Sequence, residues 1–411
     1  MSKEKRRVPK LRFPGFTEDW EQRKLCQITT RVTRKNGGQS DLPLTISAQD
    51  GLVDQRKYFN RQVASRDMSN YYLIKKGEFA YNKSYSEGYP FGAVKRLDYY
   101  DIGALSTLYI LFEITDNNIS SDFIVSYYMT HLWYKEISKR AAEGARNHGL
   151  LNISTEDFFD SDLNIPNSIE EQVKIGNFIK QLDKFITLHQ RKLEQLNLKK
   201  KALLQKLFPK NGECYPELRF PGFTDAWEQR KLGDFTNQIN TFVNPEDAKL
   251  PLWSLTAEAG LIEKSDRYER DFLVKKKDQF KRIETNTLVY NPMNITIGSI
   301  DIYTGLYPIA VSGYYVSIVY DKNIDTDFLK EVLLLPSSLK MYKNYATGSL
   351  IERQRVQYPT FSKLQLLLPN LDEQKAIGQI FKSLNLNITL HQRKLDHLQL
   401  QKKALLQQMF V

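Results

Sequence analysis

Cysteine and long apolar runs are both scarce in this chain. Only two of its 411 residues are cysteines, Cys26 and Cys214, and they lie far apart. This argues against a disulfide framework or a cysteine-based zinc site, and it favours a reducing compartment, so we expect a cytoplasmic protein. No stretch approaches the ~18 consecutive apolar residues of a membrane-spanning helix. The basic segment 1–10 has no apolar run behind it, as a secretory signal would need.

Motifs for catalysis are also missing. The sequence has no Gly-rich phosphate loop before a helix, no HExxH and no convincing nuclease-type carboxylate pair. The nearest approach to an adenine methyltransferase loop is "YNPMN" at 290–294. Met293 stands where such a loop has its second proline, and Asn294 stands where it has an aromatic residue. We therefore expect no catalytic residue, no metal site and no cofactor bound by this chain.

The chain carries a formal net charge of +11, which points to a polyanionic partner. The excess is not spread evenly. Counted from the sequence, residues 26–167 hold 16 basic and 17 acidic residues and residues 233–369 hold 16 of each, whereas residues 168–208 hold 9 basic and 4 acidic. Any DNA-binding face on the two long, neutral segments must therefore come from local clusters.

Much of the sequence occurs twice. "LRFPGFTEDWEQRKL" at 11–25 returns as "LRFPGFTDAWEQRKL" at 218–232 with 13 of 15 positions identical. The segment 186–208 returns at 388–410 with 17 of 23 identical. A period of half the chain indicates a duplicated domain rather than a solenoid.

Two segments have the heptad spacing of a coiled coil. Each is expected to form a helix of about 40 residues, roughly 60 Å long at 1.5 Å per residue, and equal spacing favours pairing of the two. Ser168 and Glu171 suggest a capping box at the first helix start, and Pro209 follows its end. The expected seam residues are Ile175, Ile179, Leu182, Ile186, His189, Leu193, Leu196, Lys200, Leu203 and Leu207, with Ile377, Phe381, Leu384, Ile388, His391, Leu395, Leu398, Lys402, Leu405 and Met409 in the second copy.

The segments between these helices read as mixed α/β. Residues 108–114 and 314–320 are rich in aromatic and β-branched residues and are expected strands, and residues 123–141 have helical spacing. The predicted fold class is α+β, with two similar mixed α/β domains and two long coiled-coil helices that arise from an internal duplication. The expected segments are an N-terminal segment 1–25, a domain 26–167, a helix 168–208, a repeated junction 209–232, a domain 233–369 and a C-terminal helix 370–411.

Polar loops at matched positions of both copies carry the chemistry that reads base edges. Asn and Gln can bond adenine bidentately, and Arg and Lys can bond guanine. Such loops differ in side chains between the copies, as expected if each copy reads a different sequence. The candidate DNA-binding residues are Ser47, Gln49, Tyr81, Asn82, Lys83, Ser84, Tyr85, Lys95, Arg96, Arg146, Asn147 and His148 in the first copy, and Thr256, Tyr290, Asn291, Asn294, Thr296, Ser349, Arg353 and Arg355 in the second.

The paired "LRFPGF…WEQRKL" signatures, the helix starts "EEQ…IGNF" and "DEQ…IGQIF", and the two "LHQRKL…KKALLQ" helices together resemble the specificity subunit of type I restriction-modification systems. The resemblance covers essentially the whole chain in order. It implies two target-recognition domains, each binding one half of a split, asymmetric site in double-stranded DNA. It implies that two long antiparallel coiled-coil spacer helices separate these domains, and that segment 1–25 packs near the C-terminal helix to complete a pseudo-twofold arrangement. It also implies two modification subunits that dock on the helices with S-adenosylmethionine, and two restriction subunits that use ATP and Mg²⁺.

Two other readings stay open from the residues alone. A coiled-coil scaffold would join proteins without reading DNA, but it does not explain matched loops with different residues. A stand-alone DNA methyltransferase or nuclease would need the cofactor and catalytic motifs that the sequence lacks.

Overall fold

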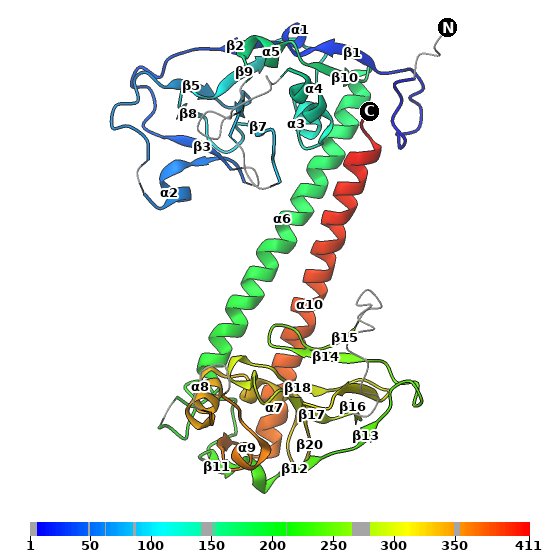
Figure 1. Cartoon of the computed structure of the whole chain (residues 1–411). Coiled ribbons are helices and arrows are strands. Elements are labelled where there is room, and N and C mark those ends of the chain that lie inside the picture. The colour runs from blue at the N-terminus through cyan, green and yellow to red at the C-terminus, as the bar shows by residue number, and fades with distance from the viewer. Residues whose placement is uncertain are drawn as a thin grey trace. The chain divides into compact units, whose positions relative to one another are not determined.

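The computed structural model describes residues 6–47, 50–61, 63–84, 88–140, 151, 153–210, 212–264, 280–348 and 354–411. Its internal contacts divide the chain into two compact units (Figure 1). Unit 1 comprises Met1–Gln190 together with Arg393–Val411, and unit 2 comprises Arg191–Gln392. Each long helix is therefore divided between the two units.

Unit 1 is a mixed α/β domain with the start of one long helix and the end of the other. Its elements, in chain order, are β1 (Glu21–Lys24), α1 (Leu25–Ile28), β2 (Thr29–Val32), β3 (Leu44–Ser47), β4 (Gly51–Asp54), α2 (Gln55–Phe59), β5 (Tyr72–Lys75), β6 (Phe79–Asn82), β7 (Ala93–Arg96), β8 (Ile102–Leu105), β9 (Ile110–Ile114), α3 (Ser121–Tyr128), α4 (Leu132–Arg140), α5 (Thr155–Phe159), β10 (Asp162–Ile165) and the first part of α6 (Ile169–Lys206).

Unit 2 repeats this plan. After the second part of α6 come β11 (Glu228–Lys231), η2 (Leu232–Asp234), β12 (Thr236–Ile239), β13 (Phe242–Val243), β14 (Trp253–Thr256), β15 (Gly260–Glu263), β16 (Phe280–Ile283), β17 (Thr287–Tyr290), η3 (Ile295–Ile297), β18 (Ile300–Tyr303), β19 (Ile309–Ser312), β20 (Val316–Tyr320), α7 (Thr326–Leu333), α8 (Pro336–Tyr345), α9 (Tyr358–Phe361), β21 (Gln365–Leu368) and the first part of α10 (Leu371–Gln408).

The sheets confirm that the two units are copies of one fold. The central sheet of unit 1 has the strand order β2-β9-β6-β7, and that of unit 2 has the order β12-β20-β17-β18. Unit 1 has an isolated bridge between Lys35 and Tyr72 where unit 2 has the short strand β13. With β13 set aside, the two central sheets use equivalent strands in the same order, and every pairing in both sheets is antiparallel. Strands were expected at 108–114 and 314–320, and they are β9 and β20.

The heptad seam predicted from the sequence is confirmed by the burial pattern of α6 and α10. From Thr187 to Lys199 of α6, every residue is exposed except the seam positions His189, Leu193 and Leu196. In unit 1 the end of α10 runs antiparallel to the start of α6, because Met409 packs in one core with Ile175 while Lys402 binds Asp183 further along. A 3.5-residue repeat keeps one stripe of each helix turned toward its partner.

The seam lysines of the two units pair with carboxylates from different elements. In unit 1, Lys402 Nζ lies 2.5 Å from Asp183 Oδ1 on the facing helix. In unit 2, the equivalent Lys200 lies 3.1 Å from Glu331 of α7, and Asn385 takes the place of the aspartate. A lysine in an apolar seam needs a carboxylate within reach, and each copy supplies it from a different element.

The repeated signature closes each unit onto the end of a long helix. The Leu218 N–H donates to the C=O of Lys206 at 2.8 Å, and the Leu11 N–H donates to the C=O of Gln408 at 3.0 Å. Both acceptors are carbonyls of the last helical turn, which have no partner inside the helix. Within unit 1, Leu11 therefore lies against the end of α10.

An arginine of each signature binds a buried glutamate at the start of a long helix. Arg219 donates two hydrogen bonds to Glu373, of 2.8 and 2.7 Å, and Arg12 donates two to Glu171, of 2.7 and 2.8 Å. The glutamate side chains are only 1% exposed. We call each pair a signature clamp. Planar guanidinium and carboxylate groups match in this bidentate geometry, which fixes orientation as well as charge.

This clamp corrects the expected capping box. Ser168 does accept a hydrogen bond from the Glu171 N–H, at 3.4 Å. The Glu171 carboxylate, however, turns to Arg12 instead of back to the helix start. The helix expected over 123–141 is also two helices, α3 and α4, separated at Met129–His131. No helix in the described part of the chain is long and apolar enough to cross a membrane.

Candidate functional site

The two loops predicted to read DNA in the second copy lie against each other in unit 2. The turn 291–299 leaves the buried strand β17, and the Val356 N–H donates to the C=O of Pro292 at 3.0 Å. Thr347 and Arg355 pair through two backbone hydrogen bonds of 3.0 and 2.9 Å, which hold the second loop at its base. Sequence-distant loops thus form one surface.

The same contact recurs in unit 1. The Leu151 N–H donates to the C=O of Lys83 at 3.1 Å, just after strand β6. Lys83 Nζ also donates to the C=O of Ile153 at 3.3 Å, and Asn82 Oδ1 accepts from the Ser84 N–H at 3.0 Å. Residues 82–84 are half-exposed, and these hydrogen bonds fix the side chains of Asn82 and Lys83 within the loops. We refer to the paired loops of each unit as its loop junction.

Beside this junction, position 92 can be occupied only by glycine. Its φ is +79°, and a Cβ at this position would lie 1.9 Å from the backbone oxygen of Asn82. No side chain can fit there, so the hairpin between β6 and β7 depends on glycine for both its conformation and its close approach.

Tyr81 and Tyr290 do not belong to a DNA-facing surface, contrary to the sequence expectation. Both are fully buried, and Tyr81 stacks on Phe158 with ring centroids 4.6 Å apart, as Tyr290 does on Phe361 at 4.8 Å. Burial raises the pKa of both phenols well above the ordinary value. These tyrosines build the floor beneath the loops and cannot reach a base edge from this position.

Arg96 is likewise occupied within the protein. It donates to Asp98 at 2.7 Å, to Ser121 Oγ at 2.8 Å and to Asp122 at 2.7 Å. Its side chain is 12% exposed, so it ties β7 to the start of α3 instead of presenting a free guanidinium. The neighbouring Lys95 is half-buried, and burial, helped by the nearby charge of Lys402, lowers the pKa of Lys95 to about 8.

Ser47 and Thr256 shape equivalent hairpin turns. Ser47 Oγ donates to the Asp50 carboxylate at 2.9 Å and accepts from the Asp50 N–H at 3.1 Å, and Ser47 is buried. Thr256 Oγ1 accepts from the Ala259 N–H at 3.0 Å in the turn between β14 and β15. Their hydroxyls stabilise local turns, which was not foreseen from the sequence.

The most accessible predicted residues lie at the loop junction of unit 2. Asn294 and Arg355 are exposed and Thr296 is half-exposed. Asn291 Oδ1 accepts from the Met293 N–H at 3.0 Å, so that amide is used in the turn, whereas the Asn294 side chain makes no capping hydrogen bond. The remaining predicted residues fall outside the described part of the chain: Gln49, Tyr85, Arg146, Asn147, His148, Ser349 and Arg353.

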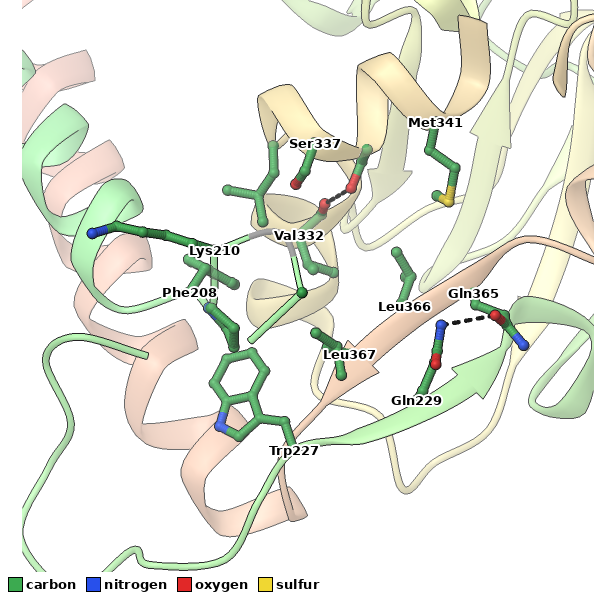
Figure 2. A pocket seen from close by; sticks show the side chains of 14 residues that line it. Phe208, Lys210, Trp227, Gln229, Val332, Ser337, Met341, Gln365, Leu366 and Leu367 are labelled. Carbon is green, nitrogen blue, oxygen red and sulfur yellow. Dashed lines mark hydrogen bonds between the residues drawn. The ribbon is translucent and has the colours of Figure 1, made fainter. Parts of the chain in front are cut away.

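A cleft that the sequence did not suggest lies in unit 2 beside the signature (Figure 2). Phe208, Trp227 and Val332 contribute apolar walls, and Gln229 donates to Gln365 across β11 and β21 at 2.8 Å. None of the residues lining it is a carboxylate or a histidine. Lys210 is the one ionisable side chain among the residues that line the cleft, so the lining holds no acid–base pair and no set of metal ligands. Across the described residues, no cluster of three or more metal-ligating side chains forms either.

The signature clamps were also missed from the sequence. Arg12 and Arg219 are both repeated, as are Glu171 and Glu373, and this shared duplication is the signal that could have paired them.

Comparisons with known proteins agree with this architecture. A family model described as "Type I restriction modification DNA specificity domain" matches residues 53–198 and 224–400. A curated relative, the putative type I restriction enzyme MjaX specificity subunit of Methanocaldococcus jannaschii, is 22% identical over 97% of this chain and 94% of its own length.

Among solved structures, the S subunit of a type I restriction-modification system from M. genitalium is similar with a TM-score of 0.64 and 14% identity, covering 98% of this chain and 99% of that one. The HsdS subunit from Thermoanaerobacter tengcongensis matches with a TM-score of 0.41 and 13% identity over 100% and 99% of the two chains.

Proposed function

Because the chain belongs to the type I restriction-modification DNA specificity family, we propose that each of its two units reads one half of a split, asymmetric DNA site. The family assigns the chain to DNA sequence recognition. In the proposed mechanism the chain has no catalytic site of its own and directs adenine methylation and restriction by partner subunits.

The observation that carries this proposal is the repeated loop junction. The backbone bond from Leu151 to Lys83 in unit 1 has its counterpart in the bond from Val356 to Pro292 in unit 2. The framework is thus the same, while the side chains around it differ. Two frameworks of one shape with different surface residues suit the reading of two different half-sites.

The loop junction of unit 2 has the chemistry to read A·T pairs. Asn294 offers an amide that can bond the N6 and N7 edge of adenine, and apolar side chains favour the thymine methyl group. Met293 is 41% exposed and Ile297 is 61% exposed on either side of Asn294 in the same turn. We propose that this turn contacts at least one A·T pair of the half-site.

The long helices are proposed to set the half-site spacing and to dock two modification subunits. Leucines are exposed at equivalent outer positions of both helices: Leu188 and Leu390 at 62% and 52%, and Leu198 and Leu400 at 62% and 66%. Exposed leucines repeated in both copies suit two equivalent docking sites. The modification subunits would bring S-adenosylmethionine, and two restriction subunits would bring ATP and Mg²⁺.

Methylome sequencing tests the proposed function directly. Cells that carry the complete system should show adenine methylation at one split motif, and deletion of this chain should abolish it. Exchange of residues 26–167 for the equivalent segment of another family member should change only one half of that motif. Unchanged methylation after deletion, in an active system, would refute the proposal and favour a scaffold, and a change in both halves would refute two independent readers.

Helix docking can be tested separately. The double variant Leu188→Glu with Leu390→Glu should co-purify less modification subunit than wild type, because each change places a charge in an apolar contact. The control is Asn197→Glu, a charge placed at an exposed polar position of the same helix. Equal co-purification of both variants with wild type would exclude these leucines from the docking site.

A further inference from the structure

A short helix in unit 1 combines exposed aromatic and basic side chains that the loop junction does not use. Helix α2 follows the hairpin of β3 and β4, and none of its residues is buried. Tyr58 is 51% exposed and Phe59 is 43% exposed, and their rings pack edge to face with centroids 5.0 Å apart. We call residues 56–61 the α2 knob. Its aromatic surface contributes to no core, so its presence needs another explanation.

The α2 knob has a side-chain cap at its start and a left-handed residue at its end. The Asp54 side chain accepts from the Arg56 N–H at 3.0 Å and binds the Arg56 guanidinium through two contacts of 3.1 Å. Asn60 ends the helix in the left-handed conformation, with φ of 49°. A fixed turn presents Tyr58 and Phe59 outward without the entropy cost of ordering them on binding.

Positive charge is concentrated around this turn. Residues 55–66 contain four basic residues and no acidic one, although the whole segment 26–167 is slightly acidic. Arg56 is paired with Asp54. Lys57, Arg61 and Arg66 are exposed, and none has an ion-pair partner among the residues that the structure describes. This exposed surface is therefore positively charged and favours an anionic ligand.

We infer that the α2 knob is a second DNA contact of unit 1, which grips the duplex backbone independently of base reading at the loop junction. Lys57 and Arg61 pair with phosphates, and Tyr58 with Phe59 packs against sugars and the minor-groove edge of the bases. Apolar side chains flanked by cations are the usual means of minor-groove contact. The inference rests on the proposed DNA-reading function. The equivalent segment of unit 2 falls within residues 265–279, outside the described part of the chain.

A protein partner is the competing occupant, since exposed aromatic residues also favour protein interfaces. The unpaired cations favour DNA, because a polyphosphate complements all three of them at once. The two occupants predict different responses to salt and can be separated by measurement.

The test is fluorescence anisotropy of the full-length chain on a labelled duplex selected by the wild type from random-sequence DNA, at several salt concentrations. The charge variant is Lys57→Ala with Arg61→Ala. Loss of two phosphate contacts should reduce the slope of log K against log salt by about 1.8 and weaken binding about 60-fold at 0.1 M salt. The aromatic variant, Tyr58→Ala with Phe59→Ala, should weaken binding at least about 5-fold with an unchanged slope.

Matched controls keep the inference falsifiable. Lys10→Ala with Lys135→Ala removes the same charge from exposed positions of the same unit, where neither lysine has an ion-pair partner among the described residues, and should leave the slope close to wild type. Both α2 variants should unfold at the wild-type temperature, since α2 buries no residue. Equal slopes for the charge variant and wild type, or an aromatic variant that binds DNA normally, would overturn the inference. Failure of the wild type to prefer its selected duplex over a scrambled one would instead refute the proposed function.

Discussion

The signature clamp makes a quantitative prediction about stability. In unit 2, replacing Arg219 by alanine leaves Glu373 without its partner in a site where the carboxylate is 1% exposed. Removing one member of a buried ion pair typically costs ~3–5 kcal/mol, because an uncompensated charge remains. In a unit of this size each kcal/mol lowers the unfolding temperature by about 2–4 °C. We therefore expect the transition of unit 2 to fall by roughly 6–20 °C.

Differential scanning calorimetry of the full chain measures this change, and hydrogen exchange locates it. Exchange should rise at the start of α10 and in the signature segment 218–232, while unit 1 keeps its protection. The matched variant Arg12→Ala should produce the mirror result in unit 1, because its clamp has the same geometry.

A double substitution tests the cause. Arg219→Met with Glu373→Leu removes both charges and should recover much of the lost stability, as apolar replacements of buried pairs often do. Two results would contradict the reasoning: a loss of less than about 1 kcal/mol for Arg219→Ala, or a double variant less stable than the single one. Either would show that the clamp does not hold the signature to the helix.

Three further changes test other contacts. Burial alone would raise the pKa of Asp122, but hydrogen bonds from Lys180 and Arg96 outweigh burial and leave that pKa lowered. The stabilisation from the ionised Asp122 is therefore present above the unfolded pKa of about 3.9 and is lost as pH falls through the lower folded pKa. In urea unfolding, Asp122→Asn should lose less stability than wild type as the pH is lowered through this range. Gly176→Ala should destabilise unit 1, since a Cβ there would lie 2.8 Å from the Phe123 N, and a thermal melt unchanged from wild type would contradict this close approach. Asn294→Ala should relax the methylated motif at one A·T position of one half-site only, and an unaltered motif would remove Asn294 from the reading surface.

The helices and the duplication could be predicted from the sequence because both are local patterns. Heptad spacing places Lys200 and Lys402 at the seam, and burial confirms these positions. The acids that balance them could not be foreseen. One is Asp183 on the facing helix and the other is Glu331 on α7, so equivalent lysines use non-equivalent partners.

The candidate site was predicted less well than the fold. The sequence predicted loops at matched positions of both copies but not that the two loops of a unit contact each other. The contributions of single side chains depended on burial. Tyr81 lies one residue before the end of β6 and Tyr290 ends β17, and both strands are buried on both faces there. The sequence pattern does not show whether a tyrosine at such a position packs inward or points out. Arg96 looked available until α3 brought Ser121 and Asp122 beside it from 25 and 26 residues away. Long-range partners of this kind leave no trace in local sequence.

The closure of unit 1 by Leu11 and Gln408 has a consequence for biosynthesis. Trp20 and Phe123 pack against Phe410, which is made long after both of them. Unit 2 has all its residues once Gln392 has been added, whereas unit 1 still lacks 393–411 at that stage. A nascent or truncated chain must therefore leave this aromatic surface uncovered, and contacts across so long a loop form slowly. Such exposed surface is what chaperones and proteases detect, so unit 1 should stay sensitive to both until the end of α10 has been made and has packed.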